Sequence, residues 1–229
     1  MKRTLLFIAC VLASITMQAQ AEGEYESLLS EGKTWTMSYR SPYQEGKVNY
    51  VESKLEGDTI IGDVTFKRKY DREWKQGDAT PQEWKATDYY VGEDGGKVYY
   101  YYKVLNDEPQ LLMDFSAKVD DVIPVQIEGT PSGIKVVSVD NTILGSSTDQ
   151  TRRRCLDVRD TWHNRSDTWI EGIGSMTFGI ENYFMNMLTG GIPKFIKCQY
   201  NGQTLYEDDA QEEQNDTFLF WRKARFCVW

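Results

Sequence analysis

The only histidine of the chain, His163, is the residue that acid-base catalysis near neutral pH would need. A Ser-His-Asp or Cys-His mechanism would have to use its imidazole as the base. Ser166 and Asp167 follow it too closely in sequence for the usual convergent arrangement, and Ser175 lacks the G-x-S-x-G pattern of a hydrolase elbow. The sequence therefore favours an ordinary polar loop histidine over a catalytic one.

Carboxylates are the second group of side chains with chemical potential. Glu171, Asp157 and Asp160 lie near one another in sequence and are candidates for the acid and base of glycoside hydrolysis. The chain has 35 Asp and Glu residues, so such pairs arise throughout it and carry little information. The sequence has no clustered zinc ligands, no calcium loop and no glycine-rich phosphate loop. We therefore predict no metal site and no cofactor.

Aromatic side chains give the strongest indication of binding. They make up 13% of the chain, and exposed Trp and Tyr rings offer sugars or peptides a flat apolar face with a polar edge. The candidate ligand-binding residues are Trp74, Trp84, Tyr100, Tyr102 and Trp162. Four basic residues share a predicted strand with Trp74, and we expect them on a solvated face: Lys67, Arg68, Lys69 and Arg72.

Period-two alternation predicts the strands that carry these residues. Trp35, Met37 and Tyr39 fall on one face of the first strand. Val48 to Leu55 alternates again, and Glu56-Gly57-Asp58 is typical of a turn. Similar short strands, separated by turn residues, continue along the chain. They predict an all-β fold, an antiparallel meander that forms a sandwich or a partly open barrel in a single domain with a short C-terminal extension.

The stretch from Trp169 to Gly179 alternates apolar residues with glycines. Gly172 and Gly174 can adopt positive φ angles or let another backbone approach closely. We interpret the stretch as a strand that enters a structural glycine corner, with Trp169 in the core. A backbone-lined ligand or oxyanion site at the corner is the alternative interpretation.

The two ends of the chain differ from its middle. Residues 1–21 combine Met1-Lys2-Arg3, an apolar run and Ala19-Gln20-Ala21, which is the pattern of a signal peptide. We therefore expect export to the periplasm, the cell surface or the extracellular space. Residues 22–207 are the predicted β domain, and residues 208–229 combine an acidic linker with an apolar C-terminal segment.

Charge and cysteine content narrow the choice of partners. The formal net charge is −9, and it becomes two units more negative when Lys2 and Arg3 leave with the signal peptide. Nucleic acid is a poor partner for such a chain, because phosphate binding relies on an excess of Lys and Arg. Cys155, Cys198 and Cys227 follow the predicted cleavage site. We expect Cys155 and Cys198 as small apolar residues on strands, with one bridge to Cys227 as the alternative.

Several short motifs occur in an order that resembles a known family. They are Glu31-Gly32-Lys33-Thr34-Trp35, Gly57 to Gly62, Gly96-Lys97-Val98-Tyr99, Asp114-Phe115, Trp169 to Ser175 and Lys197 to Gly202. Over residues 31–207 the chain is similar to exported, uncharacterised β-rich proteins of Bacteroidetes-type Gram-negative bacteria, including their W-x-E-G-I-G-S motif. The resemblance implies a β fold and export, and it brings no catalytic residues. Residues 208–229 do not match the C-terminal secretion-sorting domain of many members.

These observations leave three hypotheses about function. The leading one is an exported, non-enzymatic β module that binds a glycan or an envelope or host protein. A secreted hydrolase, glycosidase-like or esterase-like, that uses residues near the Trp169 to Ser175 corner is the first alternative. The second is an outer-membrane barrel, which the charges on both faces of Val64 to Trp74 disfavour. We therefore expect a chain that does not span a membrane.

Overall fold

A computed structural model describes most of the chain between Tyr25 and Asp208. The described residues are 25–40, 48–127, 130–144, 151–161, 164–181 and 192–208. Trp162, His163, Cys227 and the predicted signal peptide lie outside them, as does the segment after residue 208. Every regular element in the described residues is a strand, which confirms the predicted all-β fold. Among these residues, no helix has the length and apolar character needed to cross a membrane.

The described residues form two antiparallel sheets. The larger sheet has the strand order β13-β12-β1-β2-β3-β4-β5-β6. Its strands are β1 (Lys33–Arg40), β2 (Val48–Ile61), β3 (Val64–Lys75), β4 (Lys85–Asp94), β5 (Lys97–Tyr102), β6 (Gln110–Asp114), β12 (Ile192–Tyr200) and β13 (Gln203–Glu207). The smaller sheet has the order β11-β10-β9-β8-β7. Its strands are β7 (Val122–Ile127), β8 (Thr130–Thr142), β9 (Arg153–Asp160), β10 (Ser166–Ile170) and β11 (Gly174–Ser175).

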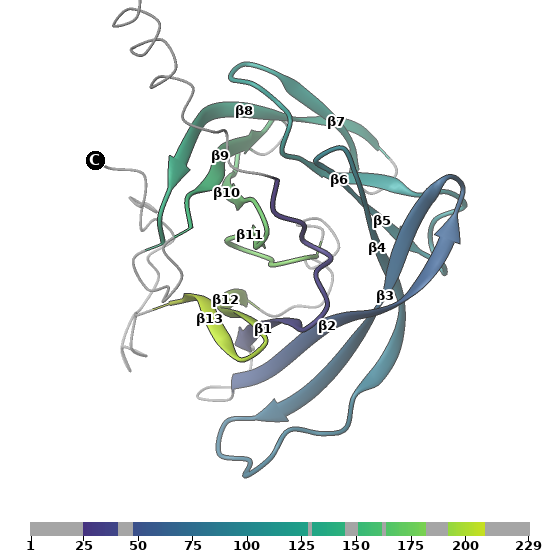
Figure 1. The fold of residues 1–229 in the computed structure, drawn as a ribbon, viewed down its shortest axis with the longest axis vertical. Helices are drawn as coiled ribbons and strands as arrows, with labels where there is room; N and C mark the ends of the chain where they lie inside the picture. Colours follow the sequence, from purple (N-terminus) through teal and green to yellow (C-terminus); the bar gives the residue numbers. More distant parts are fainter. Residues whose placement is uncertain are drawn as a thin grey trace, which may run out of the picture.

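Both sheets curl, so that they face each other as two half-barrels (Figure 1). The segment that precedes β1, purple in Figure 1, runs through the space between them beside β11. Leu28 in this segment is fully buried and belongs to the hydrophobic core. The core is therefore enclosed by the two sheets and by the polypeptide that leads into the first strand.

The core follows the predicted alternation. Trp35 and Met37 on β1 are buried and belong to the same hydrophobic cluster as Leu156 and Trp169 of the smaller sheet. The Trp35 indole nitrogen donates a hydrogen bond to the backbone oxygen of Ile173 at 2.7 Å. A buried indole needs such an acceptor, so the larger sheet is tied to the glycine corner of the smaller one.

The predicted turn at Glu56-Gly57-Asp58 is wrong, because β2 continues through it to Ile61. The pairing of β2 with β3 shifts register between Glu56 and Asp58, where Gly57 has φ of 70°. This geometry is a β-bulge, which inserts an extra residue into one strand without ending it. The turn instead lies after Ile61, which pairs with Val64 across Gly62-Asp63.

The predicted solvated position of Lys69 is also wrong, since its side chain is only 6% exposed. Lys69 lies between Arg68 and Tyr70, whose side chains are on the outer side of β3, so alternation turns Lys69 inward. Lys69 Nζ donates to Asp71 Oδ2 at 3.0 Å and to Glu181. A buried ammonium group is tolerated here because two carboxylates compensate its charge.

Candidate binding face

Six aromatic residues on the outer side of the sheet from β2 to β5 each contact another ring or a basic side chain, and we call these six the aromatic face. They are Tyr50, Tyr70, Trp74, Trp84, Tyr90 and Tyr101. Their orientation follows from alternation, because the neighbours Val91 and Tyr100 point into the core. All six residues are partly exposed. The face is therefore formed by the solvent side of the larger sheet.

Cross-strand pairing brings the rings of the aromatic face together. Tyr50 on β2 lies opposite Trp74 on β3, and their rings stack with centroids 5.4 Å apart and planes inclined by 13°. Tyr90 on β4 lies opposite Tyr101 on β5, with centroids 6.1 Å apart. Such pairs stabilise a sheet and fix the orientation of each ring before any ligand arrives.

Basic residues fill the spaces between these rings. Two of them lie over the ring of Trp84. Lys54 Nζ is 4.7 Å and the Arg72 guanidinium 4.6 Å from the centroid of this ring. The Arg68 guanidinium lies 5.7 Å from the centroid of Tyr90. All three distances fall in the range of attractive cation-π contacts. The basic residues Arg68 and Arg72 thus lie on the outer side, as predicted, and they pack on aromatic rings.

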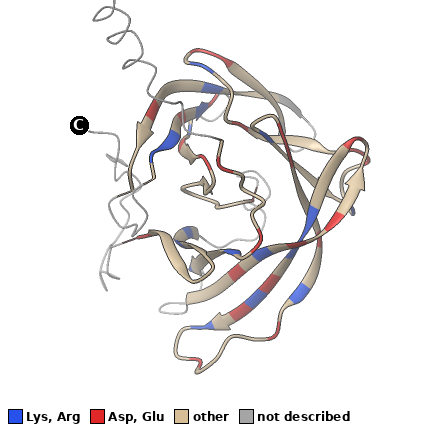
Figure 2. Cartoon of the chain, viewed as in Figure 1, with Lys and Arg blue, Asp and Glu red and all other residues tan. Residues whose placement is uncertain are grey.

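Each of these three cations also has a carboxylate partner. Lys54 Nζ lies 2.6 Å from Glu56 Oε1, and Arg68 Nη2 lies 3.3 Å from Asp88 Oδ1. Arg72 Nε donates to Glu52 Oε2 at 2.5 Å. Figure 2 shows the resulting mixture of acidic and basic bands along β2 and β3. The face combines apolar rings with hydrogen-bonding groups, and its charges compensate one another locally.

The structure divides the predicted ligand-binding residues into two groups. Trp74 and Trp84 belong to the aromatic face. Tyr100 and Tyr102 do not, because alternation turns them to the inner side of the sheet. Tyr100 is 5% exposed and stacks on Tyr89 at 5.7 Å, and Tyr102 packs against the same core cluster. The sequence alone does not show which side of the four-tyrosine run faces inward.

The glycine corner has the structural geometry that we predicted. Trp169 is 3% exposed, and φ is 73° at Gly172 and 105° at Gly174. A Cβ atom on Gly174 would lie 2.3 Å from the backbone oxygen of Gly179. Only glycine fits this close approach, so the corner is built for packing of one backbone on another.

Hydrogen bonds at the corner converge on Asp167, which is on β10. Its carboxylate accepts from Ser175 Oγ at 2.6 Å, from Thr177 Oγ1 at 2.8 Å and from the Trp169 indole at 3.1 Å. Burial raises the pKa of Asp167, and these donors oppose the increase. Ser175 Oγ in turn accepts from the backbone N–H groups of residues 177 and 178. Ser175 and Asp167 are therefore committed to holding the corner.

The candidate carboxylates near the corner point in different directions. Asp157 faces away from the core side of β9 and accepts from Ser138 and Thr168, at 2.9 and 2.8 Å. Asp160 is buried and lines a cavity of about 30 Å³ between the sheets. A cavity of this size has room for water but not for a sugar ring. Glu171 does not line that cavity; its side chain meets the segment before β1.

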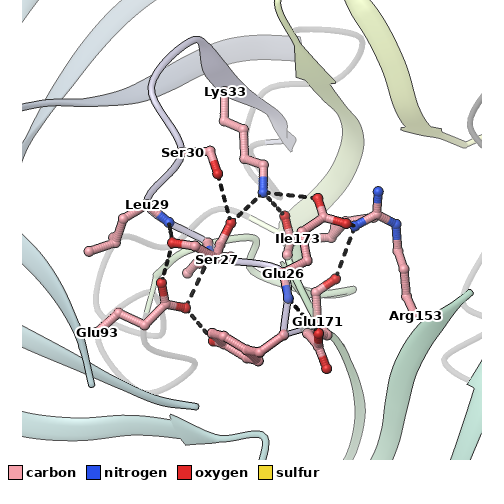
Figure 3. A network of polar contacts seen from close by, with 12 residues as sticks. Glu26, Ser27, Leu29, Ser30, Lys33, Glu93, Arg153, Glu171 and Ile173 are labelled. Atoms are coloured by element: carbon pink, nitrogen blue, oxygen red, sulfur yellow. Dashed lines mark hydrogen bonds and ion pairs between the residues drawn. The ribbon is translucent and has the colours of Figure 1, made fainter. Parts of the chain in front are cut away.

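A buried polar network anchors that segment, as Figure 3 shows. Lys33 Nζ donates to the backbone oxygens of Ser27 and Gly172 at 2.6 and 2.7 Å, and it lies 3.3 Å from Glu26 Oε1. Arg153 on β9 pairs with the other oxygen of Glu26. Glu171 Oε1 accepts from the backbone N–H of Glu26 at 2.6 Å. One short segment thus connects β1, β9 and the glycine corner.

Sequence reasoning did not assign Lys33 to a site. Its side chain is 1% exposed, and burial lowers the pKa of Lys33 while the neighbouring Glu26 carboxylate raises it. Lys33 is in phase with Trp35 and Met37, so its position on the inward face was visible in the alternation. Glu26 and Ser27 lie only seven and six residues before it, but Gly172 is distant in sequence, and no local pattern identifies any of the three as a partner.

Cys155 and Cys198 are buried on β9 and β12, which confirms the prediction that both are small apolar residues on strands. Burial raises the pKa of the Cys198 thiol to about 12, which keeps it protonated at neutral pH. Among the residues that the structure describes, no group of three His, Cys, Asp or Glu side chains is arranged to hold a metal ion.

The geometry therefore offers two kinds of polar arrangement with different uses. The network around Lys33 and the corner around Asp167 are enclosed and bind parts of the chain itself. The aromatic face is open to solvent and presents rings and ion pairs together. Comparisons with protein-family models, with curated proteins and with solved structures found no match for this chain.

Proposed function

We propose that this protein is an exported, non-enzymatic β module that binds a glycan at the cell envelope through its aromatic face. The observation that carries the proposal is the grouping of six partly exposed rings on the solvent side of β2 to β5. Sugars bind well to such surfaces, because their apolar faces pack on aromatic rings while their hydroxyls meet polar groups at the ring edges.

Two features favour binding over a purely structural role for these rings. Trp84 precedes β4 and folds back over Lys54 and Arg72, so its ring forms part of the outer surface. Tyr50 and Trp74 are pre-oriented by stacking, and pre-orientation lowers the entropy lost when a ligand binds. Export is part of the proposal and rests on the signal-peptide pattern and the family resemblance.

The proposal is tested by incubating the purified protein with a panel of immobilised glycans and mucins. Trp74→Ala and Trp84→Ala remove the two tryptophans of the face, and we expect each to weaken retention roughly tenfold, since one lost aromatic contact is worth about 1.4 kcal/mol. Tyr200→Ala is the matched control, because Tyr200 is an exposed aromatic residue on β12 outside the face. If the unmutated protein retains none of the glycans, the proposal is abandoned.

A further inference from the structure

The aromatic face is long in one direction. Along β3, Trp74 and Arg68 are six positions apart, which in an extended strand is roughly 20 Å. Tyr70 lies between them on the same side, and Tyr90 opposite Arg68 continues the row onto β4. A single sugar ring is much shorter than this row. A ligand that contacts all of it must be extended.

The charges of the face are unsuited to an acidic ligand. Lys54, Arg68 and Arg72 each have the carboxylate partner described above, at 2.6, 3.3 and 2.5 Å. An anionic sugar would have to displace these partners, and the net charge of −9 would oppose its approach. Positive charge that is already compensated gives no electrostatic attraction for a polyanion.

The same ion pairs are well suited to hydroxyl groups. The guanidinium of Arg72 supplies N–H donors and the carboxylate of Glu52 supplies acceptor oxygens, and the two lie between the rings of Trp74 and Tyr70 along β3. A sugar hydroxyl both donates and accepts, so it can bond to either member of the pair without breaking it. Rings and ion pairs therefore alternate along β3. The apolar face of a sugar unit can pack on an aromatic ring while the hydroxyls at its edge bond to the neighbouring ion pair.

From these observations, and resting on the proposed function, we infer that the ligand of the aromatic face is a neutral, linear polysaccharide that lies along β3. Its apolar ring faces pack on Trp74, Tyr70 and Trp84. Its hydroxyls bond to the pairs that Arg72 and Arg68 make with Glu52 and Asp88.

The inference is tested by affinity electrophoresis of the purified protein in gels that contain one polysaccharide each. The neutral probes are a β-glucan, a xylan and a mannan, and the acidic probes are polygalacturonate and heparin. We expect at least one neutral polymer to retard the protein equally at low and high salt, and neither acidic polymer to retard it. Trp84→Ala should weaken the neutral interaction roughly tenfold, and Tyr200→Ala should leave it unchanged.

A charge variant gives a second readout. Glu52→Gln removes the partner of Arg72 but keeps a side chain of the same shape, so the face gains an uncompensated positive charge. We expect this variant to acquire salt-sensitive retardation by polygalacturonate that the unmutated protein lacks. Thermal unfolding of each variant shows whether its fold is retained.

The outcomes separate the inference from the function on which it rests. Retardation of the unmutated protein by an acidic polymer alone would overturn the neutral ligand and leave glycan binding in place. Competition by a monosaccharide as effective as that by a long oligosaccharide would overturn the extended ligand. Retardation by none of the five polymers overturns this inference, and glycan binding itself falls only if the immobilised glycans and mucins also retain nothing.

Discussion

Lys33 at the start of β1 holds Glu26, seven residues earlier in the chain, at 3.3 Å inside the protein. The pair closes a short loop (Figure 3), and the polypeptide of this loop lies between the two sheets (Figure 1). Arg153 shares the Glu26 carboxylate, and Gly172 supplies a backbone acceptor for Lys33. The entry segment, the larger sheet and the smaller sheet are thus connected at one point. Substitutions of the residues at this point test the arrangement of the two sheets directly.

Replacement of Lys33 by methionine should lower the free energy of unfolding by about 3 kcal/mol, the usual result of removing one partner of a buried ion pair. Methionine keeps the apolar stem of the side chain but removes the donor to the Gly172 carbonyl, and it leaves the Ser27 carbonyl with only Ser30 Oγ, at 3.2 Å, as a side-chain donor. Urea denaturation measures the loss. The control is Lys135→Met, which breaks the 2.7 Å pair with Asp120 at a largely exposed position and should cost less than about 1 kcal/mol. Equal losses in both variants would contradict the anchoring role.

Glu171 gives the network a dependence on pH. Burial raises the pKa of Glu171 above its usual 4.5, the Glu26 carboxylate adds to the increase, and the Glu26 N–H and two arginines oppose it. Because the pKa of Glu171 is higher in the folded state than in the unfolded state, its carboxyl group contributes fully to stability below the unfolded-state pKa. This contribution is lost as the pH rises through the folded-state pKa. Glu171→Gln keeps an acceptor oxygen for Glu26 and does not ionise.

As the pH rises from about 4 to 7, the unmutated protein should therefore lose free energy of unfolding relative to Glu171→Gln, which does not ionise at this position. Denaturant titrations at several pH values measure this difference. Glu83→Gln changes an exposed carboxylate and should give a difference that is flat over the same range. A flat profile for Glu171→Gln would show that its carboxylate is not desolvated.

Local patterns predicted much of the fold. The alternation of Trp35 and Met37 assigned the buried face of β1, and the glycines at positions 172 and 174 marked the corner. In both cases the information is held within a few residues, because alternation and positive φ angles are local properties. The strand type and the corner could therefore be derived without the structure.

Features that depend on distant pairing could not be derived. The bulge at Gly57 resembled a turn, because register is set by the partner strand. The inward face of β3 could not be assigned either, because charged residues occur on both of its faces. Tyr100 and Tyr90 are both tyrosines on neighbouring strands, yet one is core and the other surface. The aromatic face was thus identified only in part, through Trp74 and Trp84.

The corner itself can be tested with two alanine substitutions that separate steric conflict from backbone strain. At Gly174, with φ of 105°, an added Cβ would meet the Gly179 oxygen at 2.3 Å. At Gly77, with φ of 92°, nothing lies within 4 Å of the added atom. Gly77→Ala should cost about 1 kcal/mol for the unfavourable φ alone.

Gly174→Ala should cost clearly more, about 3 kcal/mol, because the backbone must also move. Thermal denaturation of the two variants gives the comparison. If Gly174→Ala is no worse than Gly77→Ala, the close approach of the two backbones at the corner does not occur in solution.

The last prediction concerns Lys69, whose charge is enclosed by the larger sheet. Burial lowers the pKa of Lys69, but the Glu181 and Asp71 carboxylates outweigh this effect and hold it above its usual value. The charged ammonium group of Lys69 therefore contributes fully to stability below the unfolded-state pKa of lysine, and this contribution is lost only in strongly alkaline solution. Lys69→Met should reduce the free energy of unfolding by about 3 to 5 kcal/mol at neutral pH.

The loss in Lys69→Met should shrink in acid, because the two carboxylates left without their cation can be neutralised by protons. Denaturant titrations at acidic, neutral and alkaline pH measure this profile. Lys194→Met, which removes a partly exposed partner of Asp208 at 2.9 Å, should cost less than about 1 kcal/mol throughout. A pH-independent loss for Lys69→Met would mean that the side chain contributes through packing of its stem, and that the buried charges are not coupled.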